Sequence, residues 1–479
     1  MSEKILLHVA YPLWRKNSLV ALARAKQLQV EGHDVTLSYC ATTGGTCAVN
    51  YTGNPLACLV CQASTRRISA QLGLAAIPLK PEPQPSEPIS IAEKKALVEG
   101  VLSGLISTFR LFAAEIRSIR LMRWIARRYY RTSLGMLAAF KSVVRQQQPD
   151  RIEVFNGRHA CSKFPLLAAE HFHLPFNTLE VTSRQQPIIF HGHTAHDRFG
   201  IQRRILNLEP DLEFASRFFE RRQSPSHNKF AKRHASRFTP PEANGYRRKV
   251  TFFLSSQDEF ASLGKAWKSP FVDSDVISEA SRRWPDYFFC VRFHPNQVDV
   301  GSDIISPFRE VAERDNVQVY YPDDTANTYQ LIDWSDVVVT FGSTVTVEAC
   351  WRGKPAILLG PSFYDQLEVA DTPASPEAFY ELLGHELLPK DRTNAARVAK
   401  YFLADEDPLE FLECRGGKIR PHGFRRPLQT LGYLARYSEV VACQIIKTLA
   451  RKSNTNNRHK ADRVLRAAPE DQTNQQRAA

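Results

Sequence analysis

Residues 335–360 read SDVVVTFGSTVTVEACWRGKPAILLG, and their pattern indicates the fold class. The apolar run at 337–341 has the length of one buried strand, and a second short apolar run follows at 356–359. Between them, the spacing of apolar residues at 344–352 predicts a helix. Strand, helix and strand in this order predict two parallel strands joined by a crossover helix.

The same alternation runs through the residues that precede this stretch. Strand patterns at 250–254, 287–293 and 317–321 alternate with helical patterns near 272–284, 303–314 and 325–333. Such alternation specifies a parallel sheet with helices on its faces. Ligands of these sheets bind beyond the carboxyl ends of the strands, so the loops that follow the strands are the candidate site.

A second lobe of the same class is predicted at the N-terminus. A strand at 5–9, a helix and a strand at 34–39 form one strand–helix–strand unit, and strand patterns return at 151–155 and 176–181. The predicted fold class is therefore α/β, with two Rossmann-like lobes that face a cleft. A helical insertion is expected at about 91–147 in the N-terminal lobe.

These patterns divide the chain into five segments. We expect an N-terminal lobe at 1–200, a basic interlobe linker at 201–249, a C-terminal lobe at 250–400, a helical segment at 401–450 and a disordered tail at 451–479. A chain of 479 residues is too long for one hydrophobic core, which agrees with two lobes.

Composition excludes several classes of protein. With 43% apolar and 24% charged residues the chain has the makeup of a globular protein, which excludes collagen-like, disulfide-scaffold and wholly disordered classes. No apolar run has the length of a bilayer span, and the N-terminus lacks the layout of a secretion signal. Nine cysteines are an odd number, which favours reduced thiols, and we expect a cytoplasmic protein.

The net charge of +13 is concentrated in a few segments. Residues 110–131 contain seven arginines and one glutamate, with Trp124 among them, and this pattern suits the anionic inner face of the cytoplasmic membrane. A solvated basic helix face is the ordinary alternative. We expect no nucleic-acid partner, because the sequence has no zinc-finger, RRM or homeodomain signature and charge alone is weak evidence.

Two loops that follow predicted strands have anion-binding chemistry. Gly342, Ser343 and Thr344 precede a helix, where glycine permits close approach of the backbone, and the hydroxyls and free N–H groups attract phosphate or carboxylate. A plain helix cap is the alternative. His294 follows the strand at 287–293 and precedes a proline, which favours an extended backbone and a fixed direction of the imidazole. A surface histidine in a turn is the alternative there.

A third loop follows the strand at 250–254. Ser255 and Ser256 can donate hydrogen bonds to a phosphate, whereas Asp258 and Glu259 would repel one and would instead face sugar hydroxyls. A capping box formed by Ser256 and Glu259 is the alternative.

The order of these motifs carries a family resemblance. The motifs are Ser-Ser-x-Asp-Glu-Phe at 255–260, Arg-Phe-His-Pro-Asn at 292–296, Asn-Thr-Tyr at 327–329, the strand and loop at 335–344, Glu-Ala at 348–349 and Gly-Lys-Pro-Ala at 353–356. Over about 250–365 the chain resembles the C-terminal lobe of bacterial capsule and surface polysaccharide biosynthesis glycosyltransferases of the GT-B type. The His-Pro and Ser/Thr pairs are also similar to those of Kdo and sialic acid transferases, which use CMP-linked sugars.

The resemblance implies a glycosyltransferase that moves a sugar from a nucleotide-sugar donor to a surface polysaccharide or glycolipid, without a metal or other cofactor. It implies that His294 binds the donor phosphate, that Ser343 and Thr344 bind phosphate or a donor carboxylate, and that Glu348 holds ribose hydroxyls. Together with Arg292, His294 would neutralise the departing phosphate, which makes it a catalytic candidate. CMP is a candidate nucleotide.

The N-terminal lobe is expected to bind the acceptor and to supply the base. Asn156, Gly157 and Arg158 follow a predicted strand and resemble the N-G-R element of the same family, which implies contact with the acceptor. Glu180 ends the next predicted strand, and an inverting transfer needs a carboxylate to deprotonate the attacking hydroxyl. Val181 follows it where relatives carry a basic residue and glycine, and a glutamate paired with an arginine is the alternative.

The first lobe also contains a cysteine motif. Cys47, Cys58 and Cys61, with Cys40 upstream, include a C-x-x-C pair and form a candidate zinc site. Buried or free thiols are the alternative.

Two other functions are alternatives to the assigned activity. A nucleotide-sugar 2-epimerase shares the two-lobed fold, but that class would be favoured by Gly-Ser-Gly-Gly where this chain has Gly-Ser-Thr-Val at 342–345. A non-catalytic polysaccharide assembly protein would bind nucleotide weakly or not at all.

Overall fold

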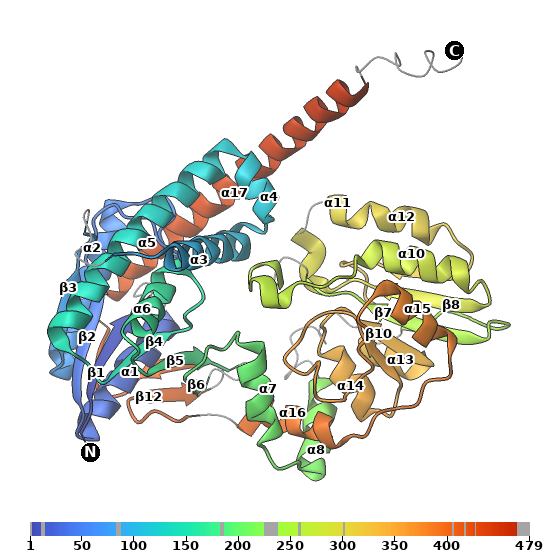
Figure 1. Ribbon diagram of the computed structural model, residues 1–479, viewed down its shortest axis with the longest axis horizontal. Coiled ribbons are helices and arrows are strands. Elements are labelled where there is room, and N and C mark those ends of the chain that lie inside the picture. The colour runs from blue at the N-terminus through green and yellow to red at the C-terminus, as the bar shows by residue number, and fades with distance from the viewer. Residues whose placement is uncertain are drawn as a thin grey trace. The chain divides into compact units, whose positions relative to one another are not determined.

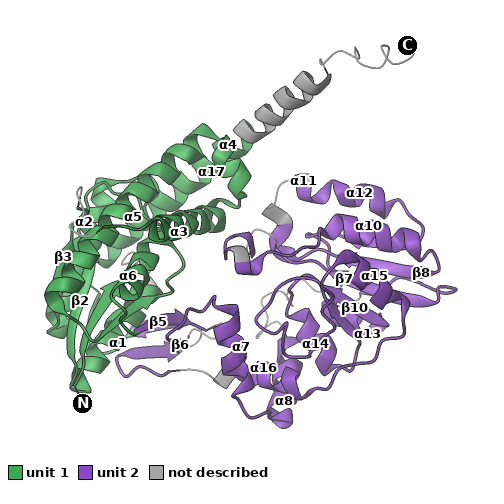
Figure 2. Cartoon of the chain, in the orientation of Figure 1, with its two compact units in different colours: residues 1–175, 421–479 green, residues 176–420 purple. Residues whose placement is uncertain are grey.

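The computed structural model describes residues 2–10, 15–82, 88–182, 186–224, 238–256, 260–299, 302–404, 407–415, 418–426 and 428–466. The chain forms two compact units (Figure 2): Met1–Pro175 with Pro421–Ala479 make unit 1, and Phe176–Arg420 make unit 2. Helices alternate with the strands of two large sheets (Figure 1). The predicted α/β class with two Rossmann-like lobes is confirmed.

The first sheet has six strands in the order β3-β2-β1-β4-β5-β6. The strands are β1 (Lys4–Val9), β2 (Asp34–Cys40), β3 (Ala75–Leu79), β4 (Arg151–Phe155), β5 (Phe176–Val181) and β6 (Pro187–His191). β1 pairs in parallel with β2 and β4, and β2 with β3, whereas β6 is antiparallel to β5. α1 (Arg15–Val30) joins β1 to β2, and α2 (Pro55–Leu72) joins β2 to β3. The sequence predicted neither β3 nor β6, and the proline-rich residues from 73 onward were expected to lack strand character.

A helical insertion separates β3 from β4, as the sequence predicts. It consists of α3 (Ile91–Phe109), α4 (Ala113–Ser118) and α5 (Arg120–Gln147). Ser90 and Glu93 form a capping box at the start of α3, in which the Glu93 N–H donates to Ser90 Oγ and the Ser90 N–H donates to the Glu93 carboxylate. The buried Nζ of Lys141 in α5 lies 2.6 Å from Glu93 Oε1, so an ion pair joins the two long helices.

Residues that follow unit 2 in the sequence complete unit 1. α6 (Ala160–His171) follows β4, and α17 (Gln429–Arg466) packs against α2. The Glu439 carboxylate in α17 accepts hydrogen bonds from the N–H groups of Tyr51 and Thr52, and from Thr52 Oγ1 at 2.7 Å. α17 continues to Arg466 within the segment expected to be a tail, and residues 467–479 lie outside the described residues.

The second sheet, in unit 2, has five parallel strands in the order β11-β10-β7-β8-β9. The strands are β7 (Arg248–Phe253), β8 (Tyr287–Arg292), β9 (Val317–Tyr320), β10 (Val337–Thr340) and β11 (Ala356–Leu358). All five were predicted, with ends that differ by at most two residues. The sheet is buried on both faces, which explains the continuous apolar runs in the sequence.

Two apolar clusters cover the two faces of this sheet. Along β8, Phe288 and Cys290 pack into one cluster, while Phe289 and Val291 pack into the other. The first cluster includes side chains of α8 (Leu212–Arg222), α13 (Thr328–Trp334), α14 (Val345–Trp351) and α16 (Thr393–Ala404). The second includes side chains of α10 (Asp273–Arg283), α12 (Pro307–Ala312) and α15 (Pro376–Gly384).

The remaining described elements of unit 2 are short. α7 (Arg198–Leu206) and α8 occupy the first part of the expected linker, of which residues 225–237 lie outside the described residues. α11 (Ser302–Ile305) precedes α12, and β12 (Leu412–Arg415) pairs with β13 (Lys418–Pro421) as a separate two-stranded sheet. Within the described ranges, no helix combines the length and the apolar character that crossing a bilayer requires.

Candidate functional site

The predicted anion-binding loops leave the second sheet at one edge. β7 lies between β8 and β10 and all three run in the same direction, so their carboxyl ends meet there. Ser255 and Ser256 follow β7, His294 follows β8, and residues 342–344 follow β10. Because neighbouring strands are about 4.8 Å apart, the loops after β8 and β10 begin about 10 Å from each other, with the serine loop between them.

Two buried hydroxyls stand at the centre of this edge. Ser255 and Ser256 are 5% and 3% exposed, and neither Oγ has a hydrogen-bond partner within the described residues. Asp258 and Glu259 lie outside the described residues. The alternative capping box of Ser256 with Glu259 therefore stays a prediction. Buried hydroxyls in proteins are normally hydrogen-bonded, so this pair is suited to an incoming acceptor such as a phosphate oxygen.

Gly342 has a φ of +100°, a region that side chains rarely adopt. A Cβ at this position would lie 2.8 Å from Phe260 Cζ and 3.0 Å from the carbonyl oxygen of Pro361. The buried Tyr364 hydroxyl donates to the Gly342 carbonyl at 3.0 Å, and burial raises the pKa of this phenol, so it stays protonated. The turn after β10 is therefore fixed from several sides and requires glycine.

The two hydroxyl residues after this glycine have different local contacts. Ser343 Oγ accepts a hydrogen bond from the Val345 N–H at 3.3 Å, as in the helix-capping alternative. Thr344 is the N-cap residue of α14, but its side chain makes no capping hydrogen bond. Its Oγ1 instead accepts a hydrogen bond from Arg222 Nη2 at 3.4 Å.

Arg222, at the end of α8, connects two of the predicted site residues. Its Nη2 lies 2.9 Å from Glu348 Oε1, and its Nε donates to the same oxygen at 3.0 Å. Burial alone would lower the pKa of Arg222, but the Glu348 carboxylate raises it above its ordinary value. Glu348 therefore has a cationic partner, and a ribose hydroxyl would share this carboxylate with Arg222. Arg222 was not among the predicted site residues, because it stands in the basic segment expected to be a linker.

A cavity of about 290 Å³ lies beside this ion pair. Its lining residues are Phe219, Glu220, Gln223, Tyr329, Asp333, Glu348, Trp351, Arg352 and Arg392. Glu348 is thus in contact with Arg222 and also lines a polar cavity that has aromatic side chains on its wall.

His294 is held by the turn that follows it. The Asn296 N–H donates to His294 Nδ1 at 3.2 Å, and the His294 N–H donates to Gln297 Oε1 at 2.8 Å, at a short 3₁₀ helix, Pro295–Asp299. Since Nδ1 accepts a hydrogen bond, the neutral imidazole has its hydrogen on Nε2. The ring direction is therefore set by the Asn296 amide as well as by the proline.

Arg292 supports the loop after β8. Its side chain is buried, and its Nη1 donates to the carbonyl oxygens of Phe293 at 2.7 Å and Tyr321 at 3.4 Å. These hydrogen bonds connect the loops after β8 and β9. Direct contact between Arg292 and a phosphate stays a prediction.

The predicted acceptor residues of unit 1 form a tight turn after β4. Asn156 and Gly157 have φ values of +66° and +73°, and the Arg158 N–H donates to Asn156 Oδ1 at 3.1 Å. Arg158 Nη2 donates to Ser107 Oγ in α3 at 3.2 Å, and its Nε donates to His159 Nε2 at 3.3 Å. Contacts within unit 1 therefore fix the direction of the Arg158 side chain.

Glu180, the predicted base, belongs to unit 2. It lies in β5 opposite Ile188 of β6, and its Oε1 accepts a hydrogen bond from the Val181 N–H at 2.9 Å. The side chain is half-buried. Its role as a base stays a prediction.

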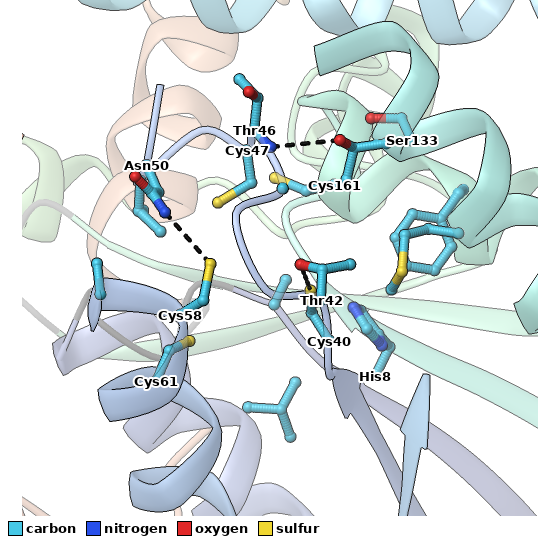
Figure 3. A pocket seen from close by; sticks show the side chains of 18 residues that line it. His8, Cys40, Thr42, Thr46, Cys47, Asn50, Cys58, Cys61, Ser133 and Cys161 are labelled. Carbon is cyan, nitrogen blue, oxygen red and sulfur yellow. Dashed lines mark hydrogen bonds between the residues drawn. The ribbon is translucent and has the colours of Figure 1, made fainter. Parts of the chain in front are cut away.

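The candidate zinc residues Cys47, Cys58 and Cys61 line one cavity in unit 1 (Figure 3). Among the residues that the structure describes, no group of three or more His, Cys, Asp or Glu side chains is arranged to hold a single metal ion. The zinc assignment therefore finds no support in the described geometry.

Comparisons with known proteins give partial similarities. No protein-family model and no curated protein matches the chain. Among solved structures, it is similar to the KpsC beta Kdo 2,4 transferase of Thermosulfurimonas dismutans, with 14% identity over 60% of this chain and 87% of that chain and a TM-score of 0.36. It is also similar to the UDP-GlcNAc 2-epimerase from Neisseria meningitidis, with 11% identity over 84% of this chain and 99% of that chain and a TM-score of 0.31.

Proposed function

We propose that this protein is a glycosyltransferase that moves a sugar from a nucleotide-sugar donor to a bacterial surface polysaccharide or glycolipid. The observation that supports it most is the pair of buried hydroxyls of Ser255 and Ser256, which have no partner among the described residues. They stand at the carboxyl edge of a parallel sheet, between the strand ends that lead to His294 and to Gly342. Hydrogen-bond donors from three neighbouring strands suit a phosphate group.

The donor phosphate would be bound at this edge. His294 would donate from Nε2 to a phosphate oxygen, and the serine hydroxyls would donate from the neighbouring loop. As the bond between the anomeric carbon and the phosphate breaks, negative charge grows on the departing phosphate, and donors already in place stabilise it. CMP is our first candidate nucleotide, since the His-Pro and Ser/Thr pairs resemble those of CMP-sugar transferases.

The acceptor would be activated by a carboxylate. Glu180 is the proposed base, which takes the proton of the acceptor hydroxyl as its oxygen attacks the anomeric carbon. Asn156 and Arg158 are the proposed acceptor contacts, and no metal takes part in this reaction scheme.

Nucleotide binding tests the donor site. CMP, CDP, UDP and GDP are titrated into the full chain by calorimetry, and one of them should bind. His294→Ala and Ser256→Ala should each weaken that binding about fivefold to tenfold, which corresponds to one lost hydrogen bond of about 1 kcal/mol. Exposed residues provide matched controls, because His385→Ala and Ser438→Ala should leave binding unchanged. If no nucleotide binds the folded wild-type chain, the donor site is wrong and the non-catalytic assembly protein is favoured.

Turnover tests the reaction. Glu180→Gln should bind the nucleotide as the wild type does and should lose transfer, whereas a fully active Gln variant would remove Glu180 from the base role. The epimerase alternative is tested by incubating the chain with UDP-GlcNAc in the absence of an acceptor. Formation of the 2-epimer there would favour that class over a transferase.

We also propose that unit 1 binds an anionic membrane surface, where a lipid-linked acceptor would be found. On α5, Arg120, Arg123 and Arg127 are exposed, and Trp124 between them is 49% exposed. Exposed arginines beside an exposed tryptophan are typical of helices that lie at a membrane interface.

An apolar stripe on α17 supports the same proposal. Its residues follow one another at intervals of three or four and each is at least 40% exposed: Leu434, Tyr437, Val441, Ile445 and Leu449. A cavity of about 470 Å³ is lined by Leu449 of α17 together with Arg120 and Trp124 of α5. The apolar stripe and the arginine-rich helix therefore meet within unit 1.

A further inference from the structure

Unit 1 contains a small cavity that the proposed transfer does not use. Its volume is about 60 Å³, several times the roughly 10–15 Å³ that one water position needs. Five of the nine cysteines line it, from four parts of the chain (Figure 3): Cys40 at the end of β2, Cys47 in the following loop, Cys58 and Cys61 in α2, and Cys161 in α6. All five are thiols rather than disulfides.

The position of the cavity is that of a ligand site. Val9 and Ala10 at the end of β1 and Cys40 at the end of β2 line it, so it lies beyond the carboxyl ends of parallel strands. Cys58 and Cys61 are three residues apart in α2 and therefore lie on the same side of that helix.

The loop between β2 and α2 is firmly fixed around the cavity. Cys47 and Asn50 exchange two main-chain hydrogen bonds of 3.1 Å. Arg128 Nη2 donates to the Gly44 carbonyl at 3.0 Å, and the Thr46 N–H donates to Thr132 Oγ1 at 3.3 Å. The thiol of Cys47 is thus held on a rigid loop.

At least three of the five sulfur atoms have polar neighbours at hydrogen-bond distance, among them Cys40 Sγ, which lies 3.0 Å from Thr42 Oγ1. Asn50 Nδ2 donates to Cys58 Sγ and the Tyr129 hydroxyl donates to Cys161 Sγ, both at 3.3 Å. Hydrogen bonds to sulfur stabilise thiolates and are a regular feature of metal–thiolate sites. Thr46 also lines the cavity; it is 1% exposed, and its Oγ1 has no hydrogen-bond partner within the described residues. A buried hydroxyl of this kind points to a missing partner in the cavity.

The arrangement does not suit a single ion. A tetrahedral zinc site needs four sulfurs or nitrogens within about 2.3 Å of one point, and the described residues contain no such convergence. The thiols instead surround a volume that is large enough for several atoms. Iron–sulfur clusters bind four cysteine thiolates around a core of this kind.

We propose that four of the five cavity cysteines bind a [4Fe–4S] cluster in unit 1. Each ligating thiol would release its proton to solvent and form one bond from Sγ to iron, without a change in the oxidation state of the sulfur. Two ferrous ions, two ferric ions and four sulfide ions would be supplied from outside the chain, which gives a [4Fe–4S] core of charge 2+ without a further oxidant. The cluster would connect β2, the following loop, α2 and α6. This inference is independent of the proposed transfer reaction.

The experiment measures iron and acid-labile sulfide in the full chain, purified without oxygen, before and after incubation with equal amounts of ferrous and ferric iron and with sulfide. We expect about four iron and four sulfide per chain after reconstitution, with the broad visible absorption of an iron–sulfur cluster. Single Cys→Ser variants are made at positions 40, 47, 58, 61 and 161. Four of them should lose most of the iron and the fifth should retain it. Cys443→Ser is the matched control, because Cys443 is a thiol of unit 1 that does not line the cavity, and it should bind iron as the wild type does.

Several results would overturn the proposal. One is a wild-type chain that is folded by circular dichroism and holds no iron or sulfide after reconstitution. Another is zinc or copper at a fixed ratio without labile sulfide, which would assign the thiols to a different metal. Equal loss of iron in Cys443→Ser would show that the iron was bound elsewhere. The iron and sulfide content of the wild-type chain tests the proposal without any variant. A serine variant that fails to fold therefore does not prevent the test.

Discussion

Arg222 and Glu348 form a largely buried ion pair that joins α8 to α14, with 2.9 Å between Nη2 and Oε1. We expect Arg222→Met to destabilise the protein by about 2–3 kcal/mol, since it leaves the Glu348 carboxylate buried without its cation. This is below the cost of breaking a fully buried pair, because the Arg222 side chain is 27% exposed. Urea unfolding followed by circular dichroism measures the change.

Two further variants make this expectation specific. Arg217→Met breaks an exposed pair with Glu213 in the same helix and should cost less than about 0.5 kcal/mol. Replacing both Arg222 and Glu348 by Met should recover most of the lost stability, because no charge is then left buried. A double variant as unstable as Arg222→Met would mean that the lost contacts, and not the unpaired charge, cause the effect.

The turn at Gly342 gives a prediction that separates strain from steric clash. Gly342 and Gly264 have nearly equal φ values of +100° and +98°, but a Cβ at Gly264 would meet nothing within 4 Å. Gly264→Ala should therefore cost about 1–2 kcal/mol through backbone strain alone. Gly342→Ala should cost more, because its Cβ would clash with Phe260, and it should also weaken nucleotide binding. Equal melting temperatures for the two variants would show that the contact of a Cβ at position 342 with Phe260 does not destabilise the protein.

The ion pair between Glu93 and Lys141 makes stability depend on pH. Burial alone would raise the pKa of Glu93, but hydrogen bonds from Lys141 and Ser90 and the charge of Lys141 lower it below its ordinary value of 4.5. A lowered carboxyl pKa contributes stability above pH 4.5 that is lost as the pH falls through the folded-state value. We expect the melting temperature to fall steeply in that range.

Substitution of this glutamate should change the pH profile. Glu93→Gln should be less stable at neutral pH, and its melting temperature should vary less with pH below 4.5. Glu99→Gln, on an exposed position of the same helix, should retain the wild-type profile. If the melting temperature of Glu93→Gln falls with pH as steeply as that of the wild type, other carboxylates cause most of the loss of stability in acid.

The proposed membrane-binding surface of unit 1 is tested with vesicles. The wild-type chain should sediment with vesicles that contain phosphatidylglycerol and much less with neutral phosphatidylcholine vesicles, and added salt should weaken binding. Tyr437→Ser together with Ile445→Ser removes two exposed apolar residues of α17 and should reduce binding several-fold. Leu388→Ser removes a residue that is 74% exposed in unit 2 and serves as the control. Concentration-dependent dimerisation that the α17 substitutions abolish, without vesicle binding, would assign the stripe to a second copy instead.

The second sheet could be predicted from the sequence because its strands are buried on both faces. Continuous apolar runs such as 337–341 then identify each strand, and the parallel direction follows from the helices between them. The same order indicates that the loops after β7, β8 and β10 meet at one edge. β6 escaped prediction because it is a short strand, Pro187–His191, at the edge of its sheet and begins with proline.

Contacts between distant segments could not be predicted in this way. Arg222 ends α8, whose buried residues Ala215, Phe218 and Phe219 have helical spacing, but this stretch was expected to be a linker. Only the packing of α8 beside α14 shows that the partner of Arg222 is Glu348. Cys161 likewise stands 100 residues after Cys61, and its place on the same cavity depends on how α6 follows β4. The spacing of cysteines in the sequence therefore identified Cys47, Cys58 and Cys61 as a motif, with Cys40 upstream. It gave no indication that Cys161 lines the same cavity.

The return of α17 to unit 1 has a consequence for biosynthesis. Glu439 provides the acceptor for main-chain N–H groups at Tyr51 and Thr52, yet almost four hundred residues separate them in the sequence. While the ribosome is still making unit 2, the earlier lobe lacks this helix and these amides lack their acceptor. Unit 2 can thus reach its native state first, and the lobe made earliest is finished only after translation has passed residue 439.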